Sequence, residues 1–72
     1  MGKEADVAVA TRYEQEAREY DCRADETEKL LSDYSEGVSQ LMARQYVECM
    51  RSAAKLSRGM ANVHRLRAGN SQ

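Results

Sequence analysis

The sequence predicts an all-α protein: a two-helix antiparallel hairpin, completed as a helical bundle by self-association or by a partner. Apolar or small residues recur every three or four positions along most of the 72 residues, which is the spacing of one helix face. No proline interrupts this pattern. Isoleucine, phenylalanine and tryptophan are absent, so a core this small needs help from a second chain.

The first helix is expected from about residue 4 to residue 31 of a single domain that spans residues 1–72. One stripe of apolar and small side chains runs along it and continues in phase into the second half of the chain. The main stripe consists of Val9, Tyr13, Ala17, Tyr20, Ala24, Thr27, Leu31, Tyr34, Val38, Met42, Tyr46, Cys49, Ala53, Leu56, Met60 and Val63. A helix with one such face buries that face against another helix.

A turn is expected at about residues 32–36, where the loop-forming residues of the periodic region cluster. Asp33 and Glu36 have the spacing of a capping box, and Gly37 follows them. The alternative is one continuous helix, because the main stripe stays in phase across this segment. A hairpin would be about 50 Å long and a single rod about 95 Å, at ~1.5 Å per helical residue.

The second helix is expected from about residue 35 to residue 67, followed by a frayed C-terminal tail. It carries a second stripe beside the main one, composed mostly of small residues: Ala43, Val47, Met50, Ala54, Ser57, Ala61, His64 and Ala68. Small residues let a neighbouring helix approach closely. A helix with two packing faces contacts two neighbours, so one of these faces is expected to bind a partner.

The two stripes are expected to have different roles. The main stripe is expected to form the hairpin seam, through Tyr13, Tyr20, Val38, Met42, Cys49, Leu56, Met60 and Val63. The small-residue stripe is expected to bind the partner, through Val47, Met50, Ala54, Ala61 and His64. The partner is a protein or a second copy of the chain, with a dimer as the simplest assembly.

Charge divides between the two halves of the chain. Residues 1–36 hold eleven acids and five bases, whereas residues 37–72 hold six bases and one acid. Opposite signs favour an antiparallel arrangement of the halves, within one chain or between chains. Each exposed pair contributes only about 0–1 kcal/mol, so the charges select orientation more than they stabilise.

A ladder of bases lies roughly opposite the main stripe on the second helix. Its members are Arg44, Arg51, Lys55, Arg58 and Arg65. Such a ladder can bind phosphates or other anions, which gives a second candidate function, a nucleic-acid-binding helical dimer. The alternative interpretation is that these bases form a solvated helix face with no binding role. Aromatic residues do not alternate with the bases, which argues against single-strand stacking.

No residue pattern predicts an enzyme, and no catalytic, cofactor-binding or metal-binding residues are assigned. The phosphate-binding loop, the nucleophile elbow and metal-ligand spacings are missing, so no cofactor and no small-molecule substrate are expected. Two widely spaced cysteines, Cys22 and Cys49, suit a reducing cytoplasm. No apolar run approaches a membrane span, and Asp6 stands where a myristoylation site needs Ser or Thr, so no membrane attachment is expected.

The predicted function is protein–protein interaction, as a small adaptor, co-chaperone or assembly subunit. A segment of a longer structural coiled coil is a further alternative. In size and two-helix layout, the chain is similar to the small co-chaperones that shield needle subunits in type III secretion. This resemblance covers most of the length but rests on no diagnostic motif, and it implies one candidate setting for the hairpin.

Overall fold

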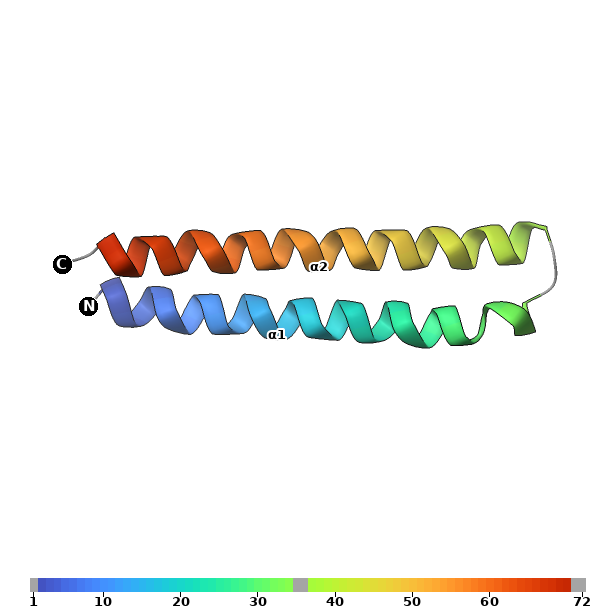
Figure 1. Ribbon diagram of the computed structural model, residues 1–72, viewed down its shortest axis with the longest axis horizontal. Coiled ribbons are helices and arrows are strands. Elements are labelled where there is room, and N and C mark those ends of the chain that lie inside the picture. The colour runs from blue at the N-terminus through green and yellow to red at the C-terminus, as the bar shows by residue number, and fades with distance from the viewer. Residues whose placement is uncertain (1, 35–36, 71–72) are drawn as a thin grey trace.

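The protein is a helical hairpin, as the sequence predicts (Figure 1). The computed structural model describes residues 2–34 and 37–70. Helix α1 spans Gly2–Lys29, a short 3-10 helix η1 spans Leu31–Asp33, and helix α2 spans Val38–Asn70. The two long helices lie side by side and antiparallel, and the molecule measures 55 × 13 × 11 Å. This length matches the hairpin and excludes the continuous rod.

The helix ends differ from the predicted boundaries by a few residues. α1 begins and ends about two residues earlier than predicted. Its C-terminal end is early because 3-10 hydrogen bonds tighten the chain after Lys29. These bonds run from the Leu30 N–H to the Thr27 carbonyl and from the Asp33 N–H to the Leu30 carbonyl. α2 extends through Asn70, three residues beyond its predicted end at about residue 67. The predicted capping box depends on Glu36, which lies outside the described residues, as do Ser71 and Gln72.

Gly37 makes the turn into α2 possible. Its φ angle is +98°, a conformation that side-chain-bearing residues rarely adopt. Its carbonyl accepts the first helical hydrogen bond of α2, from the Leu41 N–H at 3.0 Å. The chain therefore reverses direction at the glycine that the sequence marks as a break.

The core is a thin seam of alanines between the two helices. The buried apolar residues among those described are Ala10, Ala17, Ala24, Ala43, Ala54, Ala61 and Ala68. On α1 they repeat every seven residues, and half-buried Tyr13, Tyr20 and Thr27 alternate with them. Small side chains let the helix backbones approach closely, and a strict seven-residue repeat keeps the same face turned inward along both helices.

Candidate functional site

The small-residue stripe of α2 is the hairpin seam, which corrects the predicted assignment of the two faces. Of the five residues predicted to bind a partner, Ala54 and Ala61 are 0% and 1% exposed, and Val47, Met50 and His64 are half-buried along the same face. They face α1 because alanines allow close packing and because the arginines of α2 border this stripe. In the folded hairpin they are covered by the chain itself.

The residues of α2 predicted to form the seam are instead exposed. Leu56 is 73% exposed, Val38 is 72% and Met42 is 63%, and Cys49, Met60 and Val63 are also exposed. Of the predicted seam, only the α1 tyrosines, Tyr13 and Tyr20, are half-buried. The α2 half of the prediction is wrong because the two stripes of α2 exchange roles.

We call the exposed apolar face of α2 the outer stripe. Its members follow one another at alternating steps of four and three residues: Met42, Tyr46, Cys49, Ala53, Leu56, Met60 and Val63. This spacing is a seven-residue repeat that continues for three repeats. The same repeat packs α2 against α1. α2 therefore carries a second helix-packing face that the hairpin leaves in contact with solvent.

Two hollows indent the surface along the outer stripe. One is lined by Gln45, Glu48, Cys49, Ser52, Ala53 and Leu56 on the outside of α2. The other lies between the helices near the turn and is lined by Thr27, Tyr34, Ser39, Met42, Ala43 and Tyr46. Both are open and shallow, which suits side chains of another helix better than an enclosed small molecule.

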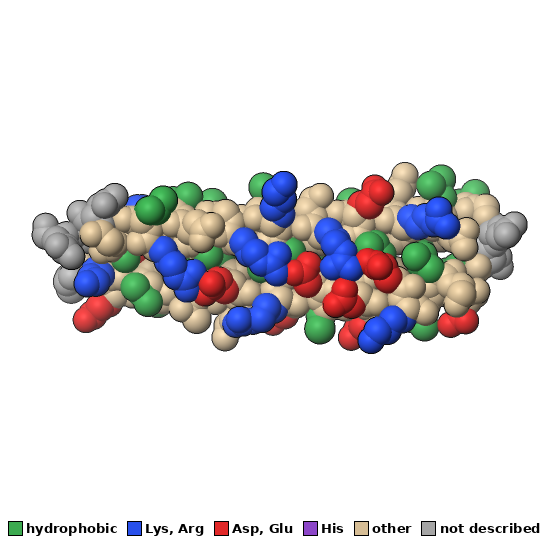
Figure 2. Space-filling model, viewed as in Figure 1, with side chains coloured by type: hydrophobic (Ala, Val, Ile, Leu, Met, Phe, Trp, Pro, Cys, Tyr) green, Lys and Arg blue, Asp and Glu red, His purple; other side chains and the backbone are tan. Residues whose placement is uncertain are grey.

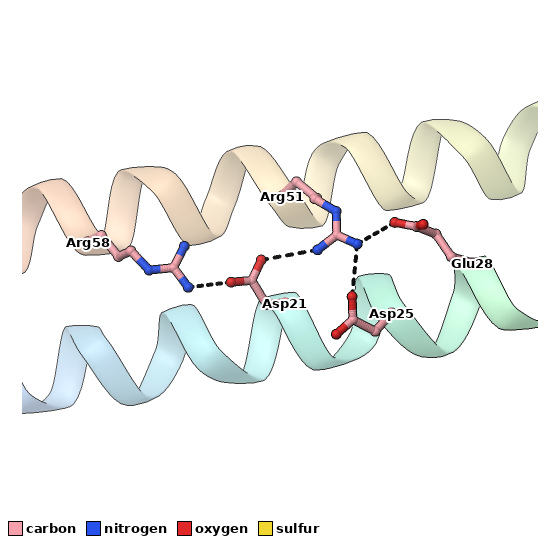
Figure 3. A network of polar contacts seen from close by, with 5 residues as sticks. All are labelled: Asp21, Asp25, Glu28, Arg51 and Arg58. Carbon is pink, nitrogen blue, oxygen red and sulfur yellow. Dashed lines mark hydrogen bonds and ion pairs between the residues drawn. The ribbon is translucent and has the colours of Figure 1, made fainter.

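Three of the five predicted anion-binding bases, Arg51, Arg58 and Arg65, form ion pairs with α1, and Figure 3 shows those of Arg51 and Arg58. The Arg51 guanidinium contacts Asp25 at 2.9 Å, Asp21 at 3.5 Å and also Glu28. Arg58 donates to Asp21, and Arg65 donates to Glu14. The space-filling view shows basic and acidic side chains gathered along the boundary between the two helices (Figure 2).

The ion pairs follow the seven-residue repeat of both helices. Glu14, Asp21 and Glu28 are seven residues apart on α1, and their partners Arg65, Arg58 and Arg51 are seven apart on α2 in the reverse order. We call this set the ion-pair ladder. Its reversed order is what an antiparallel pair of helices produces, and it confirms the orientation expected from the charge asymmetry.

The ion pairs shift the pKa values of two acids and two arginines. The hydrogen bond from Arg65 holds the pKa of Glu14 below its usual value, and the bond from Arg58 does the same for Asp21. The hydrogen bond to Asp25 raises the pKa of Arg51, and the bond to Glu14 raises that of Arg65. These arginines are therefore partly neutralised by acids of their own chain.

The remaining bases of the predicted ladder are not drawn into this network. No ion pair joins Arg44 or Lys55 to any described residue. Because Arg51, Arg58 and Arg65 are already engaged, the α2 face presents less positive charge to an anion than its sequence indicates.

His64 closes the open end of the hairpin. Its Nδ1 lies 2.8 Å from a carboxylate oxygen of Asp6, and its ring stacks on Tyr13 with centroids 5.9 Å apart. Asp6 is 7% exposed, and Arg67 lies 3.8 Å from it. A buried carboxylate needs such partners. His64 is therefore structural and not partner-facing, and sequence spacing alone had no signal for its pairing with a residue 58 positions away.

The wider comparisons add no assignment. No helix within residues 2–34 and 37–70 is both long and apolar enough to cross a membrane. No protein-family model, no curated protein and no solved structure matches the chain.

Proposed function

We propose that this protein is a non-enzymatic protein–protein interaction module that binds a helical partner through the outer stripe of α2. The observation that supports it is the unbroken heptad spacing of seven apolar or small residues on one face of α2, of which six are exposed and Ala53 is half-buried. Contiguous exposed apolar patches on small proteins mark interaction surfaces.

The chemistry of the outer stripe suits a helix as the ligand. An amphipathic helix docks through anchors spaced three and four residues apart, which is the spacing that the outer stripe presents. Met42 and Met60 are flexible and polarisable, so they adapt to the contours of a partner. Tyr46 supplies a ring with a polar tip at the edge of such an interface.

The energetics of the hairpin also support a partner. Its seam buries alanines and no large aliphatic side chain completely among the described residues. Each exposed leucine or methionine covered by a partner adds about 1.5–3 kcal/mol of favourable burial. Binding to the folded state alone then stabilises the fold by mass action.

The biological role within this class is that of an adaptor, co-chaperone or assembly subunit. Both cysteines are free thiols, which supports a reducing compartment such as the cytoplasm as the place of action. Nucleic-acid binding is not adopted as a second function, because α1 acids engage the three arginines of the ion-pair ladder.

Site-specific photo-crosslinking in the native host tests the proposal. A photoreactive amino acid at Leu56, in the outer stripe, should yield a discrete protein adduct. The same group at Gln15, an exposed position of α1, is the control and should yield none. Absence of an adduct at position 56, or equal adducts at both positions, contradicts the proposal.

A further inference from the structure

We propose that the occupant of the outer stripe is a second copy of this chain, docked antiparallel through α2, so that two hairpins form a four-helix assembly. This inference rests on the proposed function and names the partner for the same surface. It is supported by the shape of the outer stripe, by the placement of the charged residues on α2 and by the polarity of the outer face of α1.

The outer stripe is complementary to itself in shape. Leu56 is 73% exposed, and it lines a shallow hollow together with Cys49, Ser52 and Ala53, which precede it on α2. A two-fold axis near Ser52 and Ala53 turns the stripe onto itself from end to end. The same axis sets Leu56 over the partner's hollow, so each copy supplies one projecting leucine and one receptacle.

The charges of α2 do not oppose this contact. Arg51, Arg58 and Arg65 lie on the far side of α2 from the outer stripe, and each is paired with an acid of α1. The residues that flank the outer stripe on the side away from α1 carry no charge. They are Gln45, Ser52 and Gly59. Two α2 helices can therefore approach without bringing their unpaired positive charges together.

The remaining charges favour the antiparallel direction. Glu48 and Lys55 are placed almost symmetrically about the middle of the outer stripe. An antiparallel pair brings Lys55 to the level of the partner's Glu48, and the reverse pair forms at the same time. A parallel pair would align like charges, which is unfavourable.

The outer face of α1 does not offer an equivalent surface. The exposed positions on its corresponding side include Arg12, Glu16, Glu19, Arg23 and Glu26. Covering Leu56 and Met60 with these groups would desolvate charges without pairing them. The matching apolar surface in this protein is therefore another copy of α2.

The length of the outer stripe suits an extended contact between two helices. A standard interface takes about 800 Å² from each partner, and the chain exposes 5484 Å² in total. The stripe from Met42 to Val63 runs ~33 Å at ~1.5 Å per residue, along a molecule 55 Å long. Because the outer stripe and its flanks occupy one long side of the molecule, the dimer needs no rearrangement of the hairpin.

Sedimentation equilibrium over a range of concentrations is the first test. The wild-type chain should form a dimer that dissociates on dilution. Leu56→Glu should weaken dimerisation by roughly 100-fold, since it buries an unpaired carboxylate. Leu41→Glu changes an exposed leucine of α2 outside the outer stripe and should leave the dimer intact. Circular dichroism verifies that both variants keep their helices, because neither side chain contributes to the seam.

Disulfide trapping tests the direction of the pair. In a Cys22→Ser, Cys49→Ser background, Ala53→Cys lies near the two-fold axis and should form an intermolecular disulfide on mild oxidation. Met42→Cys lies at one end of the stripe, so in an antiparallel dimer it should not join its own copy. Gln15→Cys on α1 is the surface control. Efficient trapping through position 42, and not 53, contradicts the antiparallel arrangement.

The outcomes separate this inference from the proposed function. A concentration-independent wild-type monomer, or equal behaviour of the Leu41 and Leu56 variants, overturns self-association. If position 56 still crosslinks to a different protein in the native host, the interaction function stands and only the identity of the occupant is wrong. If position 56 crosslinks to nothing, both proposals fail.

Discussion

Ala54 illustrates how little space separates the two helices. It is 0% exposed, and its neighbours along the seam, Ala61 and Ala68, are also buried alanines. A methyl group is the largest side chain that such a position accommodates while the backbones stay close. The seam is therefore selective for size, and its alanines are packing residues as much as good helix formers.

Enlarging this alanine should destabilise the hairpin. Ala54→Leu overpacks the seam and should lower the free energy of unfolding by about 1–3 kcal/mol. Ala8→Leu makes the same change at an exposed position of α1 and should alter it by less than about 0.5 kcal/mol. Urea unfolding followed by circular dichroism measures both. Equal effects of the two substitutions would show that position 54 is not tightly packed.

At the scale of the element, two glycines with the same open surroundings have opposite roles. An added Cβ at Gly37 or Gly59 would meet no atom within 4 Å. Gly37 has a φ of +98° in the turn, whereas Gly59 lies inside α2 with ordinary helical geometry. The difference between them is therefore one of backbone conformation and not of space.

Alanine at these two positions should change stability in opposite directions. Gly37→Ala forces a side chain into a left-handed conformation and should cost about 1 kcal/mol. Gly59→Ala removes flexibility from a helix interior and should stabilise the hairpin by about 0.8–1 kcal/mol. Thermal unfolding of the two variants measures the difference. A gain in stability from Gly37→Ala would contradict the expected cost of placing a side chain at the positive φ of the turn.

At the scale of the whole molecule, the short connection between α1 and α2 makes the helices antiparallel, and the ion-pair ladder selects which of their faces meet. The acids of α1 and the arginines of α2 meet in reverse order, so a parallel association of the helices would separate them. Their side chains are largely exposed, so each pair stabilises the fold only weakly. The ladder therefore selects which faces meet, while the alanine seam determines how close the two helices come.

The ladder makes the stability of the whole hairpin sensitive to acid. The pKa values of Glu14 and Asp21 lie below their ordinary values of 4.5 and 3.8, because arginines donate hydrogen bonds to their ionised forms. The unfolded chain then binds more protons at low pH, so the contribution is complete above these ordinary values and is lost as the pH falls through the lowered ones.

Melting temperature should therefore decrease between pH 5 and the acid limit, and Glu14→Gln with Asp21→Asn should flatten this decrease. Added salt should reduce the contribution, because it screens exposed charges. Glu19→Gln changes an exposed acid for which no ion pair joins it to a described residue, so it serves as the control. If the melting temperature of the double variant decreased at low pH as much as that of the wild type, the role of the ladder would be contradicted.

Much of the fold was predictable because it depends on the spacing of residues that are close in the sequence. The three-and-four repeat, the absence of proline and the loop formers before Gly37 predict two helices and a turn near the observed places. The location of the exposed surface was not predicted, because α2 has two candidate stripes. The choice of Leu56 and Met60 for the seam followed side-chain hydrophobicity, which is a poor guide where close approach of the backbones is also favourable.

A signal for the correct face was nevertheless present. The arginines of α2 lie opposite the outer stripe and border the small-residue stripe. Only a seam built on the small residues lets Arg58 and Arg65 reach Asp21 and Glu14. Charge placement therefore favours the small-residue stripe, but the choice between the stripes depends on which acid each arginine meets, and only the folded hairpin shows that.

The sequence by itself determined a helical chain with a break at about residues 32–36 and an antiparallel preference, because each depends on residues close in the chain or on the net charge of each half. It left the hairpin and the continuous rod both open, and the folded structure decided between them. The tertiary structure alone decided which face of α2 is covered. That choice depends on alanines and ion pairs that act together across the two helices, and these turn Ala54 inward and Leu56 outward. It thereby moved the candidate interaction surface from the small-residue stripe to the outer stripe.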